Sequence, residues 1–275
     1  MKTYYLNGKF VLEQDAKISI NDQGFLRGFG IFDLAAIYNG KIFLKDEHLK
    51  RLKNSAKLLG LKLPYSISKI KQISQDLIAK NKTKNGLIRW VLSGGVSSTR
   101  YIEQETFAVL MEDEPNYPER YFEAGIQVIT TNLKRELPAV KSLDYQIAYS
   151  HYPKMKKAGA YEMIYTPDNL ALEATTSNLF IVKNSVVYTP KNDILLGITR
   201  KKVIELCQKN KINILECDIS KKDLLSADEV FITATTKKIM PVIKIDNEKV
   251  NDSKVGPVTK KIIELFEDFI LNRQR

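Results

Sequence analysis

The chain has 275 residues and a formal net charge of +11, and 44% of its residues are hydrophobic and 27% charged. This balance is typical of a globular protein with one large domain or two modest ones. No apolar run approaches the ~20 residues of a membrane helix, and the N-terminus lacks the apolar stretch of a secretory signal, so we expect a cytoplasmic protein with no membrane partner.

Reactive side chains that many enzymes need are scarce. Cys207 and Cys217 cannot make a disulfide framework, and we interpret both as small buried side chains of a protein in a reducing compartment. A Ser-His-Asp triad would have to use His48 or His151, and no Cys/His cluster has the spacing of a zinc site. His48 follows two acidic residues and is predicted to be solvated or to cap a helix. We therefore expect no metal site, and chemistry that rests on lysine, carboxylates or a cofactor.

The excess of positive charge is spread along the chain in lysine pairs, such as Lys201-Lys202, Lys221-Lys222 and Lys237-Lys238. A large positive charge can indicate nucleic-acid binding. No arginine-aromatic stripe accompanies these pairs, so we favour a solvated, lysine-rich surface and expect no nucleic-acid partner.

The first 45 residues are predicted to form β-structure. Asn7-Gly8 and Asn39-Gly40 are typical of two-residue hairpin turns, because both positions of such a turn need positive φ. Between them, the glycine-rich segment 22–30 leads into a predicted strand at residues 31–38.

Two helices, two strands and a linker are predicted next. Apolar residues recur at helical spacing over residues 47–59 and 68–80. Strands are predicted at residues 87–93 and 107–112. The following segment, residues 113–118, contains two prolines and is predicted to be a linker.

After the linker, predicted strands alternate with predicted helices. The strands are expected at residues 127–131, 162–165, 178–182 and 229–233, and the helices at residues 145–158, 199–209 and 257–271. We place a domain boundary near the linker, giving predicted domains at residues 1–116 and 117–275.

One lysine stands out because it lies among apolar residues, in the phrase LPAVKSLDY at residues 137–145. Burial lowers the pKa of an amine, and a neutral amine is a nucleophile that can form a Schiff base with a carbonyl group. Taken alone, the phrase favours a surface lysine, with the stem of Lys141 lying along apolar neighbours.

Three further phrases are weak separately. LEATTSNLFIV at residues 172–182 places Glu173 before a polar turn that enters a strand, which by itself indicates a hairpin. ILLGITR at residues 194–200 runs into a helix whose N-terminal N–H groups suit a phosphate, although an ordinary capped helix has the same pattern. EVFITATT at residues 229–236 is a strand ending in hydroxyls that could close a phosphate cup.

In this order and at these intervals, the phrases resemble the fold type IV pyridoxal-phosphate enzymes, also called class IV aminotransferases. Residues 24–39, the phrase EHLKRL at residues 47–52 and GPVTK at residues 256–260 match as well, so the resemblance spans nearly the whole chain. It implies a two-domain α+β or α/β fold with a small N-terminal α/β domain (1–116) and a larger C-terminal pseudo-barrel domain (117–275).

The resemblance implies roles for individual residues around pyridoxal 5'-phosphate. Lys141 would be the catalytic residue, binding the cofactor through its amine and later moving a proton. Glu173 would pair with the pyridine nitrogen and keep it protonated. The remaining cofactor-binding groups would be the Arg51 side chain and the Ile198 and Thr199 amides at the phosphate, the Thr235 side chain beside them, Leu195 on the ring face and Tyr145 at the ring hydroxyl.

The family includes branched-chain L-amino-acid aminotransferases, D-amino-acid aminotransferases, R-selective amine transaminases and 4-amino-4-deoxychorismate lyases. Arg27 lies where branched-chain enzymes usually carry an aromatic residue, and Arg89 lies in a strand that is expected to be buried. We expect these arginines to bind a substrate α-carboxylate, a pattern that resembles one subgroup of the D-amino-acid enzymes. An internal ion pair of Arg89, for instance with Asp33, is the alternative. Phe32 departs from the tyrosine of other D-amino-acid enzymes, and residues 93–98 depart from the lyase pattern.

These expectations describe a transaminase that uses an amino acid and a 2-oxo acid such as 2-oxoglutarate. The resemblance also implies a homodimer. The alternative from a different class is a basic binding protein that keeps the fold without turnover. The presence of Lys141, Glu173 and Arg51 argues against that alternative.

Overall fold

The computed structural model describes residues 1–98 and 102–274. The chain forms two compact units, one made of Met1–Pro115 and Val140–Tyr145 and the other of Asn116–Ala139 and Gln146–Arg275. The chain therefore leaves the first unit at the linker, returns to it for six residues and leaves again. The sequence predicted one crossing, near residue 116.

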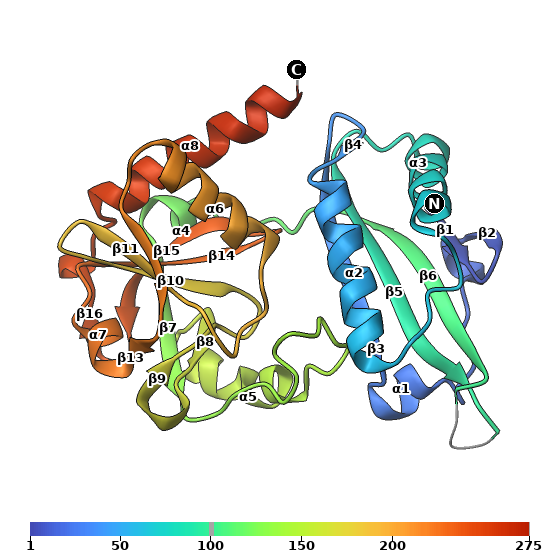
Figure 1. Cartoon of the computed structure of the whole chain (residues 1–275), viewed down its shortest axis with the longest axis horizontal. Helices are drawn as coiled ribbons and strands as arrows, with labels where there is room; N and C mark the ends of the chain where they lie inside the picture. The colour runs from blue at the N-terminus through green and yellow to red at the C-terminus, as the bar shows by residue number, and fades with distance from the viewer. Residues whose placement is uncertain (99–101, 275) are drawn as a thin grey trace. The chain divides into compact units, whose positions relative to one another are not determined.

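The first unit is built on a six-stranded antiparallel sheet with the order β2-β1-β6-β5-β3-β4 (Figure 1). Its strands are β1 (Thr3–Leu6), β2 (Lys9–Leu12), β3 (Gly30–Tyr38), β4 (Lys41–Ile42), β5 (Gly86–Val96) and β6 (Gln104–Glu112). Both predicted hairpin turns are confirmed, since Asn7, Gly8, Asn39 and Gly40 all have positive φ. A short helix, α1 (Gln23–Arg27), interrupts the glycine-rich segment and was not predicted.

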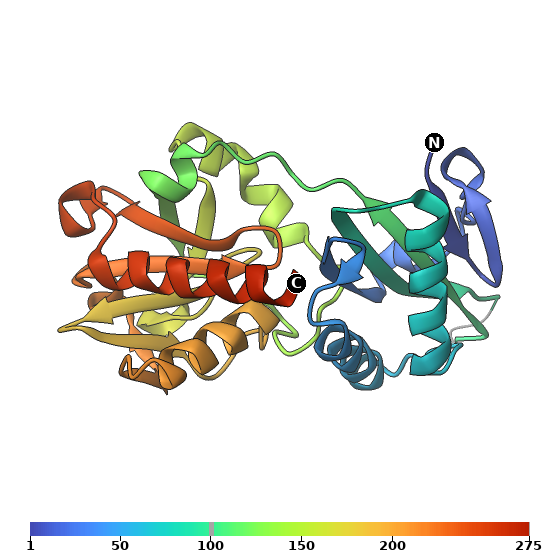
Figure 2. The ribbon, with the colours of Figure 1, turned by 90° about the horizontal axis from the view of Figure 1, so that it is seen from above.

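Two helices, α2 (Lys45–Leu59) and α3 (Ile67–Asn81), cover one face of this sheet and confirm the periodicity of the sequence (Figure 2). Their apolar sides share one core with alternate residues of the three central strands. Because side chains of a strand alternate between faces, β3 sends Ile31, Asp33 and Ala35 under the helices. Phe32 and Arg89 of the neighbouring strand β5 belong to the opposite face of the sheet.

The free edge at the start of β3 is covered by the segment that returns from the second unit's part of the chain. The Phe32 amide donates to the Lys141 carbonyl over 2.9 Å, and the Leu143 amide donates to the Gly30 carbonyl over 2.9 Å. Ile31 and Ser142 form an antiparallel bridge between these two bonds. Residues 141–143 therefore extend the sheet as an extra short strand.

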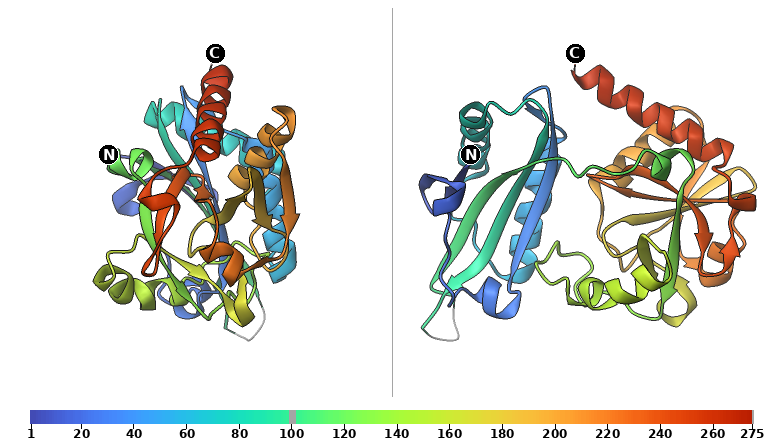
Figure 3. Two further views of the ribbon diagram at one scale, coloured as in Figure 1. Left: turned by 90° about the vertical axis from the view of Figure 1, so that its left-hand side faces the viewer. Right: turned by 180° about the vertical axis from the view of Figure 1, so that it is seen from behind.

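The second unit contains an eight-stranded mixed sheet, with the path β12-β11-β10-β14-β15-β7-β8 and β16 paired to β15. Its strands, visible in Figure 3, are β7 (Ile126–Thr131), β8 (Glu162–Tyr165), β10 (Asn178–Lys183), β11 (Val186–Pro190), β12 (Ile214–Cys217), β14 (Glu229–Ala234), β15 (Lys238–Ile245) and β16 (Glu248–Lys249). Bridges from Ile164 to Ala174 and from Glu173 to Asn178 join β8 to β10. The sheet thus curls back on itself, which agrees with the expected pseudo-barrel.

Helices and smaller elements complete the second unit. They are α4 (Arg120–Glu123), α5 (Gln146–Lys157), α6 (Ile198–Lys209), α7 (Lys221–Leu225), α8 (Pro257–Gln274), and the small sheet of β9 (Leu170–Ala171) and β13 (Ile219–Ser220). Single 3₁₀ turns occur at Glu13–Asp15, Pro167–Asn169 and Asn251–Ser253. The predicted strands β7, β8, β10 and β14 and the predicted helices α5, α6 and α8 are confirmed. Within the described residues, no helix combines the length and the apolar character needed to cross a membrane.

Candidate functional site

A buried carboxylate organises the helix-covered face of the first unit. Asp33 is fully buried, and its two oxygens accept hydrogen bonds from Arg51 Nε and Nη2, both over 2.8 Å. His48 Nδ1 lies 2.7 Å from Asp33 Oδ1. His48 is itself buried, so the prediction that it is solvated or caps a helix is wrong. The reason is that α2 presents His48 and Arg51, three residues apart, on its sheet-facing side.

This cluster keeps its charges fixed. Burial alone would raise the pKa of Asp33, but Arg51 and His48 hold it well below its usual range. Burial lowers the pKa of His48, and the nearby positive charges of Arg51 and Lys141 lower it further, against the opposing effect of Asp33. His48 is therefore neutral at pH 7, with Nδ1–H as the donor to Asp33. The cluster fixes the orientation of the Arg51 guanidinium.

The side chain of Lys141 lies on the face of the sheet opposite the helices, beside the start of β3. Its backbone amide donates to Ser55 Oγ of α2 over 3.2 Å, whereas its amine Nζ lies 4.5 Å from the centre of the Phe32 ring. The Tyr145 ring centre is 5.8 Å from the same Phe32 ring. Lys141 and Tyr145, which both received their expected roles from the family resemblance, thus lie around the Phe32 ring.

Arg89 also lies against Phe32, with its guanidinium carbon 5.0 Å from the ring centre. Its Nε and Nη2 donate to the two oxygens of Glu112, the second over 2.9 Å. An ion pair of Arg89 with Asp33, the alternative raised from the sequence, is wrong in its partner, because Asp33 points to the opposite face of the sheet. Strand β5 is largely buried, as the sequence predicted, although the side chain of Arg89 itself is 29% exposed.

Arg27 differs from Arg89 in its surroundings. It ends the short helix α1, it is exposed, and its Nη1 donates to the carbonyl of Leu26 over 3.2 Å. An exposed guanidinium has no burial cost that a bound carboxylate would have to offset, so burial gives no reason to expect an anion at Arg27. Its role in substrate binding stays a prediction.

In the second unit, Glu173 is a buried carboxylate that accepts hydrogen bonds from Arg135, Leu195 and Asn178. Oε1 accepts from Arg135 Nη1 over 3.2 Å, and Oε2 accepts from the Leu195 amide over 3.0 Å and from Asn178 Nδ2 over 3.4 Å. Arg135 and Asn178 were not identified from the sequence. Asn178 lies inside the phrase that carries Glu173, but nothing in the local pattern indicated that its amide turns back to the carboxylate.

The N-terminus of α6 is suited to an anion. Its N-cap residue is Gly197, and no side chain caps the first turn, so the Ile198 and Thr199 amides carry the positive end of the helix dipole without a local acceptor. A Cβ at Gly197 would lie 1.9 Å from Asn178 Oδ1, so only glycine allows this approach. Asn178 also donates to the carbonyl of Leu195 over 2.7 Å, which links this turn to Glu173.

The donor set fits pyridoxal phosphate in chemical terms. An amine, a buried carboxylate, an arginine and an uncapped helix N-terminus match its aldehyde, ring nitrogen and phosphate. Of the predicted residues, Arg51, Lys141 and Tyr145 belong to the first unit, and Glu173, Leu195, Ile198, Thr199 and Thr235 belong to the second. Within the described residues, no group of three or more His, Cys, Asp or Glu could hold a metal ion.

The buried Asp33 cluster predicts a specific dependence of stability on pH. The folded-state pKa of His48 is lowered, so its contribution to stability is present above the unfolded pKa, near 6.5, and is lost as the pH falls. We expect the free energy of unfolding to decrease between pH 7 and pH 5 with a slope of up to about 1.4 kcal/mol per pH unit for this proton. Denaturant titrations of a His48→Asn variant should lack that component.

His151→Asn is the matched control, because it removes the chain's other histidine without touching Asp33. The control should keep the parent's pH dependence. A His48→Asn variant with the same slope as the parent would show that folding does not lower the pKa of His48.

Known proteins resemble this chain over nearly its full length. The family model for class IV amino-transferases matches residues 30–245. A protein of Methanocaldococcus jannaschii, provisionally named a branched-chain-amino-acid aminotransferase, is 37% identical over 96% of this chain and 95% of its own. D-alanine aminotransferase of Bacillus licheniformis is 34% identical over 97% of this chain and 96% of its own.

Structural comparison agrees with these relatives. The branched-chain amino acid aminotransferase of Escherichia coli superimposes with a TM-score of 0.91 at 27% identity, covering 97% of this chain and 94% of the other. The expected two-domain fold type IV architecture is thereby confirmed. This chain belongs to the class IV aminotransferases, a family of enzymes that depend on pyridoxal 5'-phosphate.

Proposed function

We propose that this enzyme transfers an amino group between a D-amino acid and a 2-oxo acid such as 2-oxoglutarate. The observation that carries the proposal is the clustering of Lys141 and Arg89 on one aromatic ring. Both cationic groups lie within about 5 Å of the Phe32 ring centre, on the face of the sheet opposite the helices. A substrate whose α-carbon is next to the Lys141 amine would have a guanidinium within reach of its carboxylate.

Pyridoxal phosphate, when bound, supplies a ring that withdraws electrons and makes the α-hydrogen of an amino acid acidic. The side chains of this chain then have separate tasks. Lys141 anchors the cofactor through its amine and takes and returns the α-proton. Glu173, kept in place by Arg135 and Asn178, holds a proton on the ring nitrogen.

We assign several groups of this chain to the phosphate. Arg51 uses Nε and Nη2 to bind Asp33, so we assign Nη1 to the phosphate. The amides of Ile198 and Thr199 and the hydroxyl of Thr235 complete the set. Leu195 is assigned to the ring face and Tyr145 to the ring hydroxyl. Asp33 and His48 act indirectly, because they orient Arg51.

The choice of D-amino acids rests on Arg89, with Arg27 as a second candidate. Support also comes from the D-alanine aminotransferases among the relatives, while a branched-chain relative of similar identity keeps the L-specific alternative open. A 4-amino-4-deoxychorismate lyase is the third candidate within the family. We further propose that the enzyme is a cytoplasmic homodimer, as the family resemblance implies.

Removing the proposed anchor should abolish activity. We expect Lys141→Ala to lose transamination by many orders of magnitude, since one side chain supplies both the covalent link and the proton transfer. Treatment with borohydride, followed by mass spectrometry, should place the cofactor on a peptide containing residue 141 in the parent and on no peptide in the variant.

Lys50→Ala is a suitable control, because it removes an exposed lysine from α2 next to Arg51. It should keep full activity. More than about a hundredth of parental activity in Lys141→Ala, beyond what the loss of a general base alone would allow, would mean that a different lysine is the anchor.

The role of Arg89 can be separated from that of its ion pair. We expect Arg89→Gln to raise KM for amino and oxo acids and to lower kcat/KM by a factor that corresponds to about 2 kcal/mol of transition-state binding. This loss is at the low end of the range for a charged contact, because the Arg89 side chain is partly exposed. Glu112→Gln breaks the same ion pair but keeps the guanidinium, so KM should stay the same or fall. Steady-state kinetics and melting temperatures of both variants would be measured.

If Arg89 has a structural role alone, the melting temperatures of both variants should fall by similar amounts, and both variants should keep a normal KM. Substrate preference needs a separate measurement. A panel of D- and L-amino acids with 2-oxoglutarate should show turnover of the D-isomers. A clear preference for branched L-amino acids would overturn the D-specific proposal, and formation of pyruvate from 4-amino-4-deoxychorismate would favour the lyase.

A further inference from the structure

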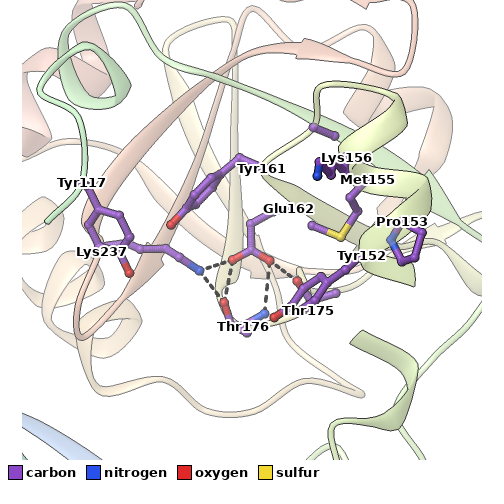
Figure 4. A pocket seen from close by; sticks show the side chains of 11 residues that line it. Tyr117, Tyr152, Pro153, Met155, Lys156, Tyr161, Glu162, Thr175, Thr176 and Lys237 are labelled. Carbon is purple, nitrogen blue, oxygen red and sulfur yellow. Dashed lines mark hydrogen bonds and ion pairs between the residues drawn. The ribbon is translucent and has the colours of Figure 1, made fainter. Parts of the chain in front are cut away.

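A second buried ion pair lies in the second unit, apart from the residues assigned so far. The Glu162 cluster consists of Glu162, Thr175, Thr176 and Lys237, which Figure 4 shows, and Ser177. Lys237 is 6% exposed and Glu162 is 1% exposed. The sequence predicted Lys237 to belong to a solvated surface, and that prediction is wrong, because its amine turns inward to the carboxylate.

The hydrogen bonds of the cluster converge on one carboxylate. Lys237 Nζ donates to Glu162 Oε1 and Thr176 Oγ1, and to Ser177 Oγ over 3.1 Å. Thr176 and Ser177 hydroxyls donate to Glu162 Oε1 over 2.7 and 2.8 Å, and the Thr175 hydroxyl donates to Oε2. The Thr176 amide adds a bond of 3.3 Å to Oε2.

Glu162 is ionised within this network. Burial alone would raise its pKa, but the Lys237 charge and the threonine hydroxyls outweigh burial and lower it. The Tyr161 ring, whose centre is 5.4 Å from Lys237 Nζ, gives the cation a second favourable neighbour. A buried ion pair of this kind adds little net stability compared with apolar side chains, although losing one partner is costly. We therefore consider which segments of the chain the ion pair holds in place.

The ion pair connects two turns, and each turn contains a proposed cofactor ligand or directly follows one. Glu173 precedes the turn at residues 175–177, and Thr235 precedes Lys237 by two residues. Asn178 pairs with Thr233, so the start of β10 lies beside the end of β14 and the two turns leave the sheet at the same end. Glu162, on β8, is bonded to both turns.

The cluster borders a cavity of about 760 Å³, which raises the alternative of a ligand site. Its walls include Tyr117, Tyr152 and Met155 (Figure 4). The polar atoms on its floor are already bonded to one another. Among the described residues, the buried side-chain atoms without a partner are the hydroxyls of Thr233 and Thr259, and neither lines the cavity. The geometry therefore favours an internal role for the cluster over recognition of a ligand.

We propose that the Lys237–Glu162 ion pair is a positioning device for cofactor binding. It locks the turn after Glu173 to the turn after Thr235, so that the ring-nitrogen carboxylate and the phosphate hydroxyl keep a fixed separation. Lys237 and Glu162 act through these neighbours and do not touch the cofactor. The inference rests on the proposed roles of Glu173 and Thr235.

The test compares cofactor binding with stability in four variants: Lys237→Met, Glu162→Gln, the double variant, and the milder Thr176→Val. Each single charge variant is expected to raise the dissociation constant for pyridoxal phosphate at least tenfold. Each is also expected to shift the pH titration of the bound cofactor's visible absorption band. The double variant, which leaves no unpaired buried charge, should lose less than the product of the two single effects. Thr176→Val should lose less than either.

Two matched controls are available: one replaces another lysine of the same cavity, and the other keeps the positive charge at residue 237. Lys156→Met removes an exposed lysine from the cavity wall and should bind cofactor normally. Lys237→Arg keeps the positive charge and should recover much of the lost affinity. A merely structural pair would lower the melting temperature of the cofactor-free and cofactor-bound enzymes equally, because at a fixed cofactor concentration the stabilisation by cofactor is set by its dissociation constant. That result would overturn the proposal.

Two reference variants separate this inference from the proposed function. Glu173→Gln and Thr235→Val should themselves weaken cofactor binding. If they do so while Lys237→Met and Glu162→Gln bind normally, only the positioning role is overturned. If Glu173→Gln and Thr235→Val bind normally, the assignment of the ligands is wrong and the positioning role falls with it.

Discussion

The architecture of the first unit depends on one short stretch of backbone pairing, between the start of β3 and residues 141–143. Two hydrogen bonds and one bridge hold this stretch to the edge of the sheet. They determine where the backbone of Lys141 lies, and strand geometry then directs its amine to the Phe32 side. A lysine presented by a strand edge has less freedom than one on a loop, which suits the roles proposed for Lys141, covalent attachment of the cofactor and proton transfer.

Successive side chains of β3 point to opposite faces of the sheet, and the two faces carry different groups of charged residues. Asp33 faces the helices and orients Arg51, whereas Phe32 faces the other way and collects Lys141, Arg89 and Tyr145. A shift of one residue in the register of β3 would exchange these faces, placing the phenylalanine under the helices and the carboxylate on the face that carries the Lys141 amine. The eight-residue pairing of β3 with β5 secures the register.

Local signals in the sequence predicted much of this structure. Asn-Gly turns and helical periodicity located both hairpins and the helices α2 and α3. Strand β15 was missed because Pro241 lies in its middle, and proline usually argues against a central strand. The partners of the candidate site were missed for a different reason: Asp33 and His48 are 15 residues apart and Glu162 and Lys237 are 75 apart, so only the folded chain reveals them. The resemblance to a family supplied Lys141 and Glu173, which no local pattern could have distinguished from a surface lysine and a hairpin carboxylate.

The double crossing of the chain between its two units also affects how the protein can be divided. Residues 1–115 are contiguous and contain the whole six-stranded sheet, yet they lack the segment that covers the start of β3. A fragment ending at the linker would expose unpaired backbone groups at an otherwise covered strand edge, a surface that promotes association between chains. The second part, from residue 116 onward, would carry Lys141, the proposed cofactor anchor, on a segment without its sheet. Gene truncation at the linker therefore separates the lysine from the strand that orients it, and neither piece is a self-contained module.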